Sequence, residues 1–220
     1  MTSDTVVTSA MLDPARAAPQ AGASWALIGG QALIAYGVPR ETLDADALVS
    51  PGSLDAVAEV LVKTFGWTPV VYDPESEDYV RTSEPVVHFM DDPVLFDVGE
   101  ERRMIPLLSP LGLPVELLAA QHPIEQEMVD AAVVQVHQGV RVPVAPLGGI
   151  LLVKRKADRP KDVAAIEQTG EHLKAASVQD ALAWAQARDP ATADDIRSIL
   201  SAARGRRAPT RTEPYTRKAP

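Results

Sequence analysis

The sequence has no cysteine, only 5% aromatic residues and no apolar run long enough to cross a membrane. Without cysteine the chain has no disulfide, no thiolate nucleophile and no zinc or iron–sulfur site with cysteine ligands. Its first residues lack a basic stretch followed by an apolar one, so we expect no signal peptide and a cytoplasmic protein. With 220 residues, 46% hydrophobic and 23% charged, the composition is that of a globular protein with a substantial core.

Positive charge is scarce outside the C-terminal end. Residues 204–220 hold six basic residues and one acidic residue, a net +5, so the formal charge of −9 leaves −14 on residues 1–203. A body of that charge repels nucleic acid at long range, which argues against a nucleic-acid reader built from basic patches. Carboxylates that hold cations would explain the excess of acid, and plain solubility explains it too.

The order of elements predicts an α+β fold with a mixed central sheet flanked by helices and a helical C-terminal part. Apolar and alternating runs predict strands over residues 24–28, 43–49, 68–72, 85–90, 94–98, 131–137 and 140–144. Helical spacing predicts helices over residues 31–36, 53–65, 147–156, 161–175, 177–187 and 191–203. Because of its prolines, we expect residues 100–121 to form a loop and one short helix.

These elements suggest four parts of the chain. An N-terminal arm covers residues 1–23 and a core covers residues 24–145. A C-terminal helical domain follows over residues 146–203, and residues 204–220 are expected to be a disordered basic tail.

The most informative segment joins a glycine turn to two acidic residues. Gly29 and Gly30 follow a buried strand and open a helix, and Asp44 and Asp46 come on the next strand. Carboxylates at i and i+2 of a strand share a face, so their repulsion must be offset by a raised pKa or by a cation. Mg²⁺ takes one or two carboxylates together with substrate phosphates, and backbone N–H groups at a helix start favour an anion. The segment therefore predicts a site for a nucleoside triphosphate with its Mg²⁺; a simple turn and a solvated strand end are the alternatives.

The order of these motifs resembles the nucleotidyltransferase superfamily of the DNA polymerase β type. The fuller string is similar to AbiEii-like toxins and related MNT-type proteins, and it reads Gly29-Gly30…Tyr36-Gly37…Arg40-x-Thr42-x-Asp44-x-Asp46. In that family a third carboxylate lies on the next hairpin, and Asp97 within residues 94–98 matches it. Farther along, Leu151 to Asp162 resembles the family's "Leu-x-x-Lys…Ala-x-Arg-x-Lys-Asp" element.

The resemblance implies a nucleotidyltransferase fold and Mg²⁺-dependent transfer of a nucleoside monophosphate from NTP to an acceptor hydroxyl. It implies that Asp44, Asp46 and Asp97 are the catalytic and metal-binding carboxylates. The nucleotide-binding residues that it implies are Gly29, Gly30, Gln31, Arg40, Thr42, Lys154, Arg159 and Lys161. The chain departs from the pattern after Asp162, where Ala165 replaces the family's second acidic residue.

Three functions remain open at this point. The first is a toxin-like enzyme that adds nucleotides to RNA, such as a tRNA 3′ end, with a protein antitoxin as partner and no membrane association. The second is a transferase that acts on a small cationic molecule of the aminoglycoside or lincosamide type, which the acidic body favours. The third is a nucleotide-binding module of the same fold without catalysis, although all three aspartates that catalysis needs are present.

Overall fold

The computed structural model describes residues 13–42, 44–73, 75, 78–86, 88–90, 102–137 and 139–206. The strands of this part of the chain are β1 (Trp25–Ile28), β2 (Ala45–Val49), β3 (Thr68–Asp73), β4 (Asp78–Arg81), β5 (His88–Met90), β6 (Arg102–Leu108), β7 (Pro114–Ala119), β8 (Val133–His137) and β9 (Val140–Val144). Its helices are α2 (Gly29–Ala35), α3 (Leu54–Phe65), α4 (Pro123–Asp130), α5 (Leu147–Ala157), α6 (Pro160–His172), α7 (Ala175–Gln186) and α8 (Pro190–Arg206). Residues 13–20 are also helical.

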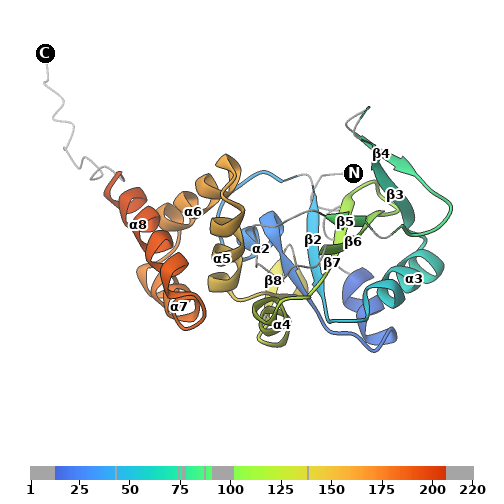
Figure 1. Cartoon of the computed structure of the whole chain (residues 1–220), viewed down its shortest axis with the longest axis horizontal. Coiled ribbons are helices and arrows are strands. Elements are labelled where there is room, and N and C mark those ends of the chain that lie inside the picture. Colours follow the sequence, from blue (N-terminus) through green and yellow to red (C-terminus); the bar gives the residue numbers. More distant parts are fainter. Residues whose placement is uncertain are drawn as a thin grey trace, which may run out of the picture.

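The strands form one mixed sheet in the order β4-β3-β6-β7-β2-β1-β9-β8, with β5 paired to β6. Strand β2 runs antiparallel to β1 and parallel to β7, and β1 runs parallel to β9. Helices α5–α8 follow the last strand and lie together at one side of the sheet, while α3 lies toward its other end (Figure 1). The predicted α+β class, with a mixed sheet, flanking helices and a helical C-terminal part, is confirmed.

The core lies between the central strands and the helices that cover them. Its largest fully buried side chains are Leu27, Leu33, Leu48, Leu54, Leu61, Ile105, Leu107, Leu117, Met128, Ile150 and Leu151. Strand β1 is buried along its whole length, as its uninterrupted apolar sequence predicts. None of the helices among the described residues has the length and apolar character that a membrane crossing requires.

The expectation for residues 100–121 is wrong. This stretch forms the antiparallel strands β6 and β7, joined by a turn over Ser109–Leu113 in the middle of the sheet. Pro106 is tolerated because it lies where the described partner of β6 changes from β5, which reaches Met104, to β3, which begins opposite Leu107. Proline is accepted in a sheet where no ladder hydrogen bond needs its N–H. A proline within this stretch is therefore compatible with a strand.

The other predicted elements agree with the structure, with small shifts. The β8–β9 hairpin turns at Gly139, whose φ of 81° suits a glycine turn. Helix α4 was not expected from the sequence. Helix α8 extends through Arg206, so residues 204–206 belong to a helix and not to a tail. The strand predicted over residues 94–98, and residues 207–220, lie outside the described residues.

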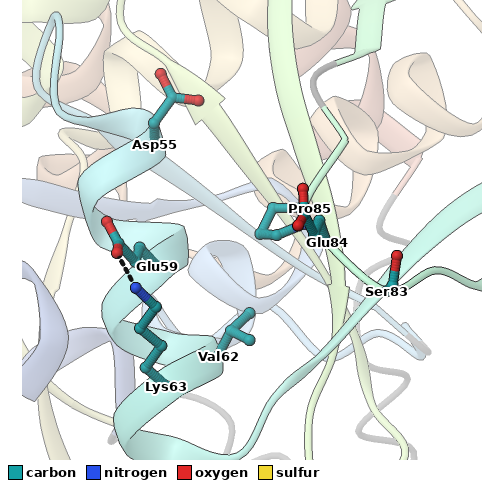
Figure 2. A pocket seen from close by; sticks show the side chains of 7 residues that line it. All are labelled: Asp55, Glu59, Val62, Lys63, Ser83, Glu84 and Pro85. Atoms are coloured by element: carbon teal, nitrogen blue, oxygen red, sulfur yellow. Dashed lines mark hydrogen bonds and ion pairs between the residues drawn. The ribbon is translucent and has the colours of Figure 1, made fainter.

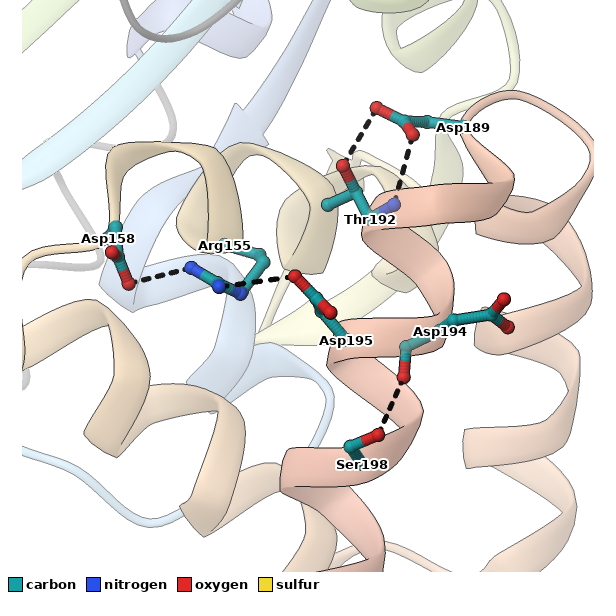
Figure 3. A network of polar contacts seen from close by, with 7 residues as sticks. All are labelled: Arg155, Asp158, Asp189, Thr192, Asp194, Asp195 and Ser198. Atoms are coloured by element: carbon teal, nitrogen blue, oxygen red, sulfur yellow. Dashed lines mark hydrogen bonds and ion pairs between the residues drawn. The ribbon is translucent and has the colours of Figure 1, made fainter.

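The C-terminal helices pack closely and are joined by ion pairs. A Cβ atom on Gly148 of α5 would lie 2.3 Å from the Ala181 carbonyl oxygen of α7, so only glycine allows this approach. Arg155 of α5 donates to Asp158 at 2.7 Å and to Asp195 of α8 at 3.2 Å (Figure 3). These contacts fix α5 against α7 and α8.

Candidate functional site

The site begins where β1 turns into α2. In the β1–β2 register Ile28 lies opposite Asp46, so the residue after β1 faces the Asp46 side chain. That residue is Gly29, with a φ of 65°, and a Cβ atom on it would lie 1.8 Å from Oδ2 of Asp46. Glycine is therefore required at position 29 for two reasons: its positive φ, and the space beside it that the Asp46 carboxylate occupies.

Thr42 lies between the second glycine, Gly30, and the first aspartate, Asp44. A Cβ atom on Gly30 would lie 2.8 Å from Oγ1 of Thr42. The same Oγ1 donates a hydrogen bond of 2.5 Å to Oδ1 of Asp44. Asp44 directly precedes β2 and is exposed, whereas Asp46 lies within the strand and is partly buried. The glycine turn and both aspartates thus form one contiguous group, as the motif predicts.

A third carboxylate that the sequence analysis missed lies beside Asp46. The parallel register of β2 and β7 places Glu116 opposite Asp46, and neighbouring strands are about 4.8 Å apart. Glu116 is partly buried, and its Oε1 accepts a hydrogen bond of 2.7 Å from the Tyr79 hydroxyl of β4. The signal that could have found it is a lone acidic residue within an apolar run, Val115-Glu116-Leu117. Asp97, the third carboxylate that the resemblance implied, lies outside the described residues.

The electrostatic state of Asp46 reflects this crowding. Burial, followed by the negative charges of Glu116 and Asp44, raises the pKa of the Asp46 carboxyl from 3.8 to about 7. The positive charges of Lys154 and Lys161 oppose the rise, so both lysines lie within electrostatic reach of Asp46. Like charges brought together out of water retain a proton unless a cation replaces it.

Lys154 is held in place by Asp162 at the junction of α5 and α6. Its Nζ lies 2.9 Å from Oδ1 of Asp162, and Nε of Arg159 lies 2.6 Å from Oδ2 of the same carboxylate. Burial alone would raise the pKa of Asp162, but the hydrogen bonds from Arg159 and Lys154 outweigh it and lower that pKa. Lys154 and Asp162 are both buried, whereas Arg159 and Lys161 are exposed. Asp162 therefore pairs with two of the predicted basic residues, Lys154 and Arg159.

Two further predicted residues lie on and after α2. Gln31 is buried at 2% exposure within α2. Arg40 lies between α2 and β2; among the described residues, its Nε and Nη1 are buried and have no hydrogen-bond partner. Guanidinium nitrogens that are buried without an acceptor are costly, and an anionic group that reached them would remove that cost.

The donor set fits Mg²⁺ in one specific way. In the part of the chain that the structure describes, no three acidic or histidine side chains lie close enough together to hold a metal ion by themselves. Mg²⁺ is commonly held by one or two carboxylates plus substrate phosphates, so Asp46 with either Asp44 or Glu116 fits an ion that arrives with a nucleotide. The absence of a side chain on Gly29 leaves room for the Asp46 carboxylate beside the turn.

An open pocket of about 370 Å³ lies elsewhere, between α3 and residues 83–85 (Figure 2). It contains none of the predicted site residues. Two of its three acidic residues, Asp55 and Glu59, are paired with Arg103 and Lys63. Because these pairs are exposed, we assign the pocket no part in the site.

Comparisons with known proteins give fold-level likenesses only. No protein-family model and no curated protein match the chain. The solution structure of the antibiotic-resistance factor ANT(2'')-Ia is similar at a TM-score of 0.47 and 14% identity, covering 90% of this chain and 93% of that chain. A nucleotidyltransferase-like antigen from Paracoccidioides brasiliensis is similar at a TM-score of 0.43 and 18% identity, covering 92% of this chain and 94% of that chain. Likenesses at this level leave the function to be argued from the site itself.

Proposed function

We propose that this chain is a Mg²⁺-dependent nucleotidyltransferase that moves a nucleoside monophosphate from NTP to an acceptor hydroxyl. The observation that carries the proposal is the contact of Asp46 with Gly29, where a carboxylate occupies the space beside a bare backbone turn. Lysines from α5 and α6 act on the same carboxylate. Negative ligands for a cation thus lie close to positive groups for phosphates, which is the combination that a chelated triphosphate needs.

On the cation side, Asp46 with Asp44 or Glu116 would hold Mg²⁺ together with the triphosphate. When bound, the ion supplies a lowered pKa for the acceptor hydroxyl and neutralises charge on the leaving pyrophosphate. Asp46, whose pKa is raised to about 7, would give up its proton on binding a cation. Glu116 is our candidate for the carboxylate that receives the hydroxyl proton, because it extends the pair of aspartates onto the next strand.

On the phosphate side, Lys154 and Lys161 would balance the charge of the triphosphate. Asp162 fixes Lys154 and leaves Lys161 exposed to solvent at the start of α6. Arg40 has two buried guanidinium nitrogens, Nε and Nη1, without an acceptor among the described residues. Binding and orienting the α-phosphate against the acceptor accounts for most of the catalysis in such a reaction.

RNA is the first acceptor we propose, as in the toxin-like enzymes that the sequence resembles, with an antitoxin protein as partner. The second is a small polycationic molecule, favoured by the charge of −14 on residues 1–203. A non-catalytic module would need neither the raised pKa of Asp46 nor the adjoining carboxylates, and we therefore rank it last.

The test is incubation of the purified protein with Mg²⁺ and each labelled NTP, against total tRNA and against a panel of aminoglycosides. We expect pyrophosphate release together with label on one acceptor class. Asp46→Asn should reduce release at least a hundredfold, because its carboxylate is part of the site. Asp55→Asn, which breaks only an exposed ion pair with Arg103, serves as the matched control. Equal rates in the two variants would disprove the proposal.

A further inference from the structure

A side chain of strand β4 contacts the candidate site, although β4 lies several strands away from β7 in the sheet. Strands β3 and β6 separate β4 from β7 in the strand order. Even so, the Tyr79 hydroxyl of β4 donates a hydrogen bond of 2.7 Å to Oε1 of Glu116 on β7. The β3–β4 hairpin therefore curves back over the sheet, and Tyr79 is the residue that joins it to the carboxylates.

We propose that Tyr79 is a positioning residue for Glu116: its hydroxyl holds one carboxylate oxygen and leaves the other for a divalent cation. This inference rests on the proposed function and takes Glu116 as the carboxylate that joins Asp46 on the cation. Tyr79 is none of the residues that the sequence motifs imply, and its position on β4 could be found only in the folded chain.

The hydrogen bond from Tyr79 to Glu116 counteracts the repulsion between neighbouring carboxylates. Glu116 and Asp46 lie opposite each other on adjacent strands, and both are partly buried. When Asp46 is ionised and no cation is bound, like charges at this spacing push a flexible glutamate side chain away from its neighbour. A neutral hydroxyl donor stabilises the carboxylate without neutralising it, so Glu116 stays beside Asp46 and remains able to bind a cation.

The Tyr79 phenol lies within electrostatic reach of all three carboxylates, Glu116, Asp44 and Asp46. Burial, the hydrogen bond to Glu116 and the charges of Asp44 and Asp46 all raise the pKa of Tyr79 well above its usual range. The phenol thus remains a neutral donor at any physiological pH. Partners that orient metal-binding carboxylates in this way commonly change metal affinity or activity by 10- to 100-fold when they are removed.

Mn²⁺ in place of Mg²⁺ offers a direct readout, since electron paramagnetic resonance measures free Mn²⁺ in the presence of protein and NTP. We expect Tyr79→Phe to weaken Mn²⁺ binding in the NTP complex by roughly 10- to 100-fold, with no change in NTP affinity measured without metal. Tyr36→Phe is the matched control. It also loses a long-range tyrosine hydrogen bond, of 2.9 Å to the Ala145 carbonyl, and should leave Mn²⁺ affinity unchanged.

The Glu116→Ala background separates a positioning role from a structural one. If Tyr79 acts through Glu116, Tyr79→Phe weakens Mn²⁺ binding no further once Glu116 is gone. Additive losses in the double variant would overturn the proposal, as would unchanged Mn²⁺ affinity in Tyr79→Phe alone. Should Glu116→Ala itself leave Mn²⁺ affinity intact, Glu116 holds no cation, and its role in the proposed function fails together with that of Tyr79.

Discussion

At the scale of single residues, the candidate site depends on how Gly29 and Asp46 share space. The Asp46 carboxylate occupies the volume that a side chain at position 29 would need, so any side chain there would displace it. The sequence shows the two residues 17 positions apart and gives each its residue type. Their contact follows only from the antiparallel register of β1 and β2.

Gly29→Ala tests this contact against a second glycine with the same backbone. Gly22 also has a φ of 65°, but a Cβ atom on it would meet nothing within 4 Å. Gly22→Ala should therefore cost only the backbone strain, about 1–2 kcal/mol. Gly29→Ala should cost a further 1–3 kcal/mol or so, because Asp46 must move. Urea unfolding measures both, and the extra cost should vanish in an Asp46→Ala background. Equal losses for the two glycine variants would rule out the contact.

The proton on Asp46 predicts how stability depends on pH. The pKa of Asp46 rises to about 7 in the folded protein, so between pH 4 and pH 7 the folded state holds a proton that the unfolded state has lost. This group therefore contributes less stability as the pH rises through that range. Asp46→Asn removes this pH dependence. Between pH 5 and pH 8, the free energy of unfolding of the variant should therefore rise by roughly 2–4 kcal/mol relative to that of the wild type. Urea unfolding in EDTA checks this, and a difference that is the same at both pH values would refute it.

At the scale of secondary-structure elements, local pattern predicts most of the fold. Apolar runs ending in glycine give β1 and the β8–β9 hairpin, and helical spacing gives α3 and α5–α8. The pattern misleads where proline lies inside a buried strand, as Pro106 does in β6. Proline is acceptable there because of the partners of β6, which are distant in sequence. That error conceals β7, and with it Glu116, the carboxylate next to Asp46.

The junction of α5 and α6 carries its own prediction. Lys154 is buried, and Asp162 is its ion-pair partner among the described residues. Asp162→Asn leaves that ammonium group without a carboxylate, which should cost about 3–5 kcal/mol in urea unfolding. Asp158→Asn at the end of α5 loses only the exposed pair with Arg155, and asparagine accepts its φ of 48° (Figure 3). That control should change stability by less than about 0.5 kcal/mol. Similar losses in the two variants would contradict the buried pair.

At the scale of the whole molecule, the candidate site is assembled from separate parts of the chain. The β1–α2–β2 segment supplies the glycines and aspartates, β7 and β4 supply Glu116 and Tyr79, and α5–α6 supply the lysines. The sequence motif predicts the first and last of these groups, because their residue types and order are distinctive. It does not include Glu116 or Tyr79: the apolar run around Glu116 marks that residue only as unusual, and its role follows once its neighbours in the sheet are known.

Charge distribution over the whole chain separates the two proposed acceptors. Residues 207–220 carry four basic residues and one acidic residue, while residues 1–203 carry −14. If RNA is the acceptor, a chain ending at Arg206 should bind it more weakly, by at least about tenfold at low salt. The slope of log affinity against log salt should also fall by roughly 0.7–0.9 for each phosphate that the shortened chain no longer neutralises.

Labelling of an aminoglycoside by the same shortened chain should be unchanged, since like charges near a polycation only oppose its binding. Fluorescence anisotropy with labelled tRNA, over a range of KCl concentrations, measures the first effect, and label transfer measures the second. Undiminished tRNA binding by the shortened chain would show that these basic residues do not overcome the acidic body, and would leave the small cationic acceptor as the better proposal.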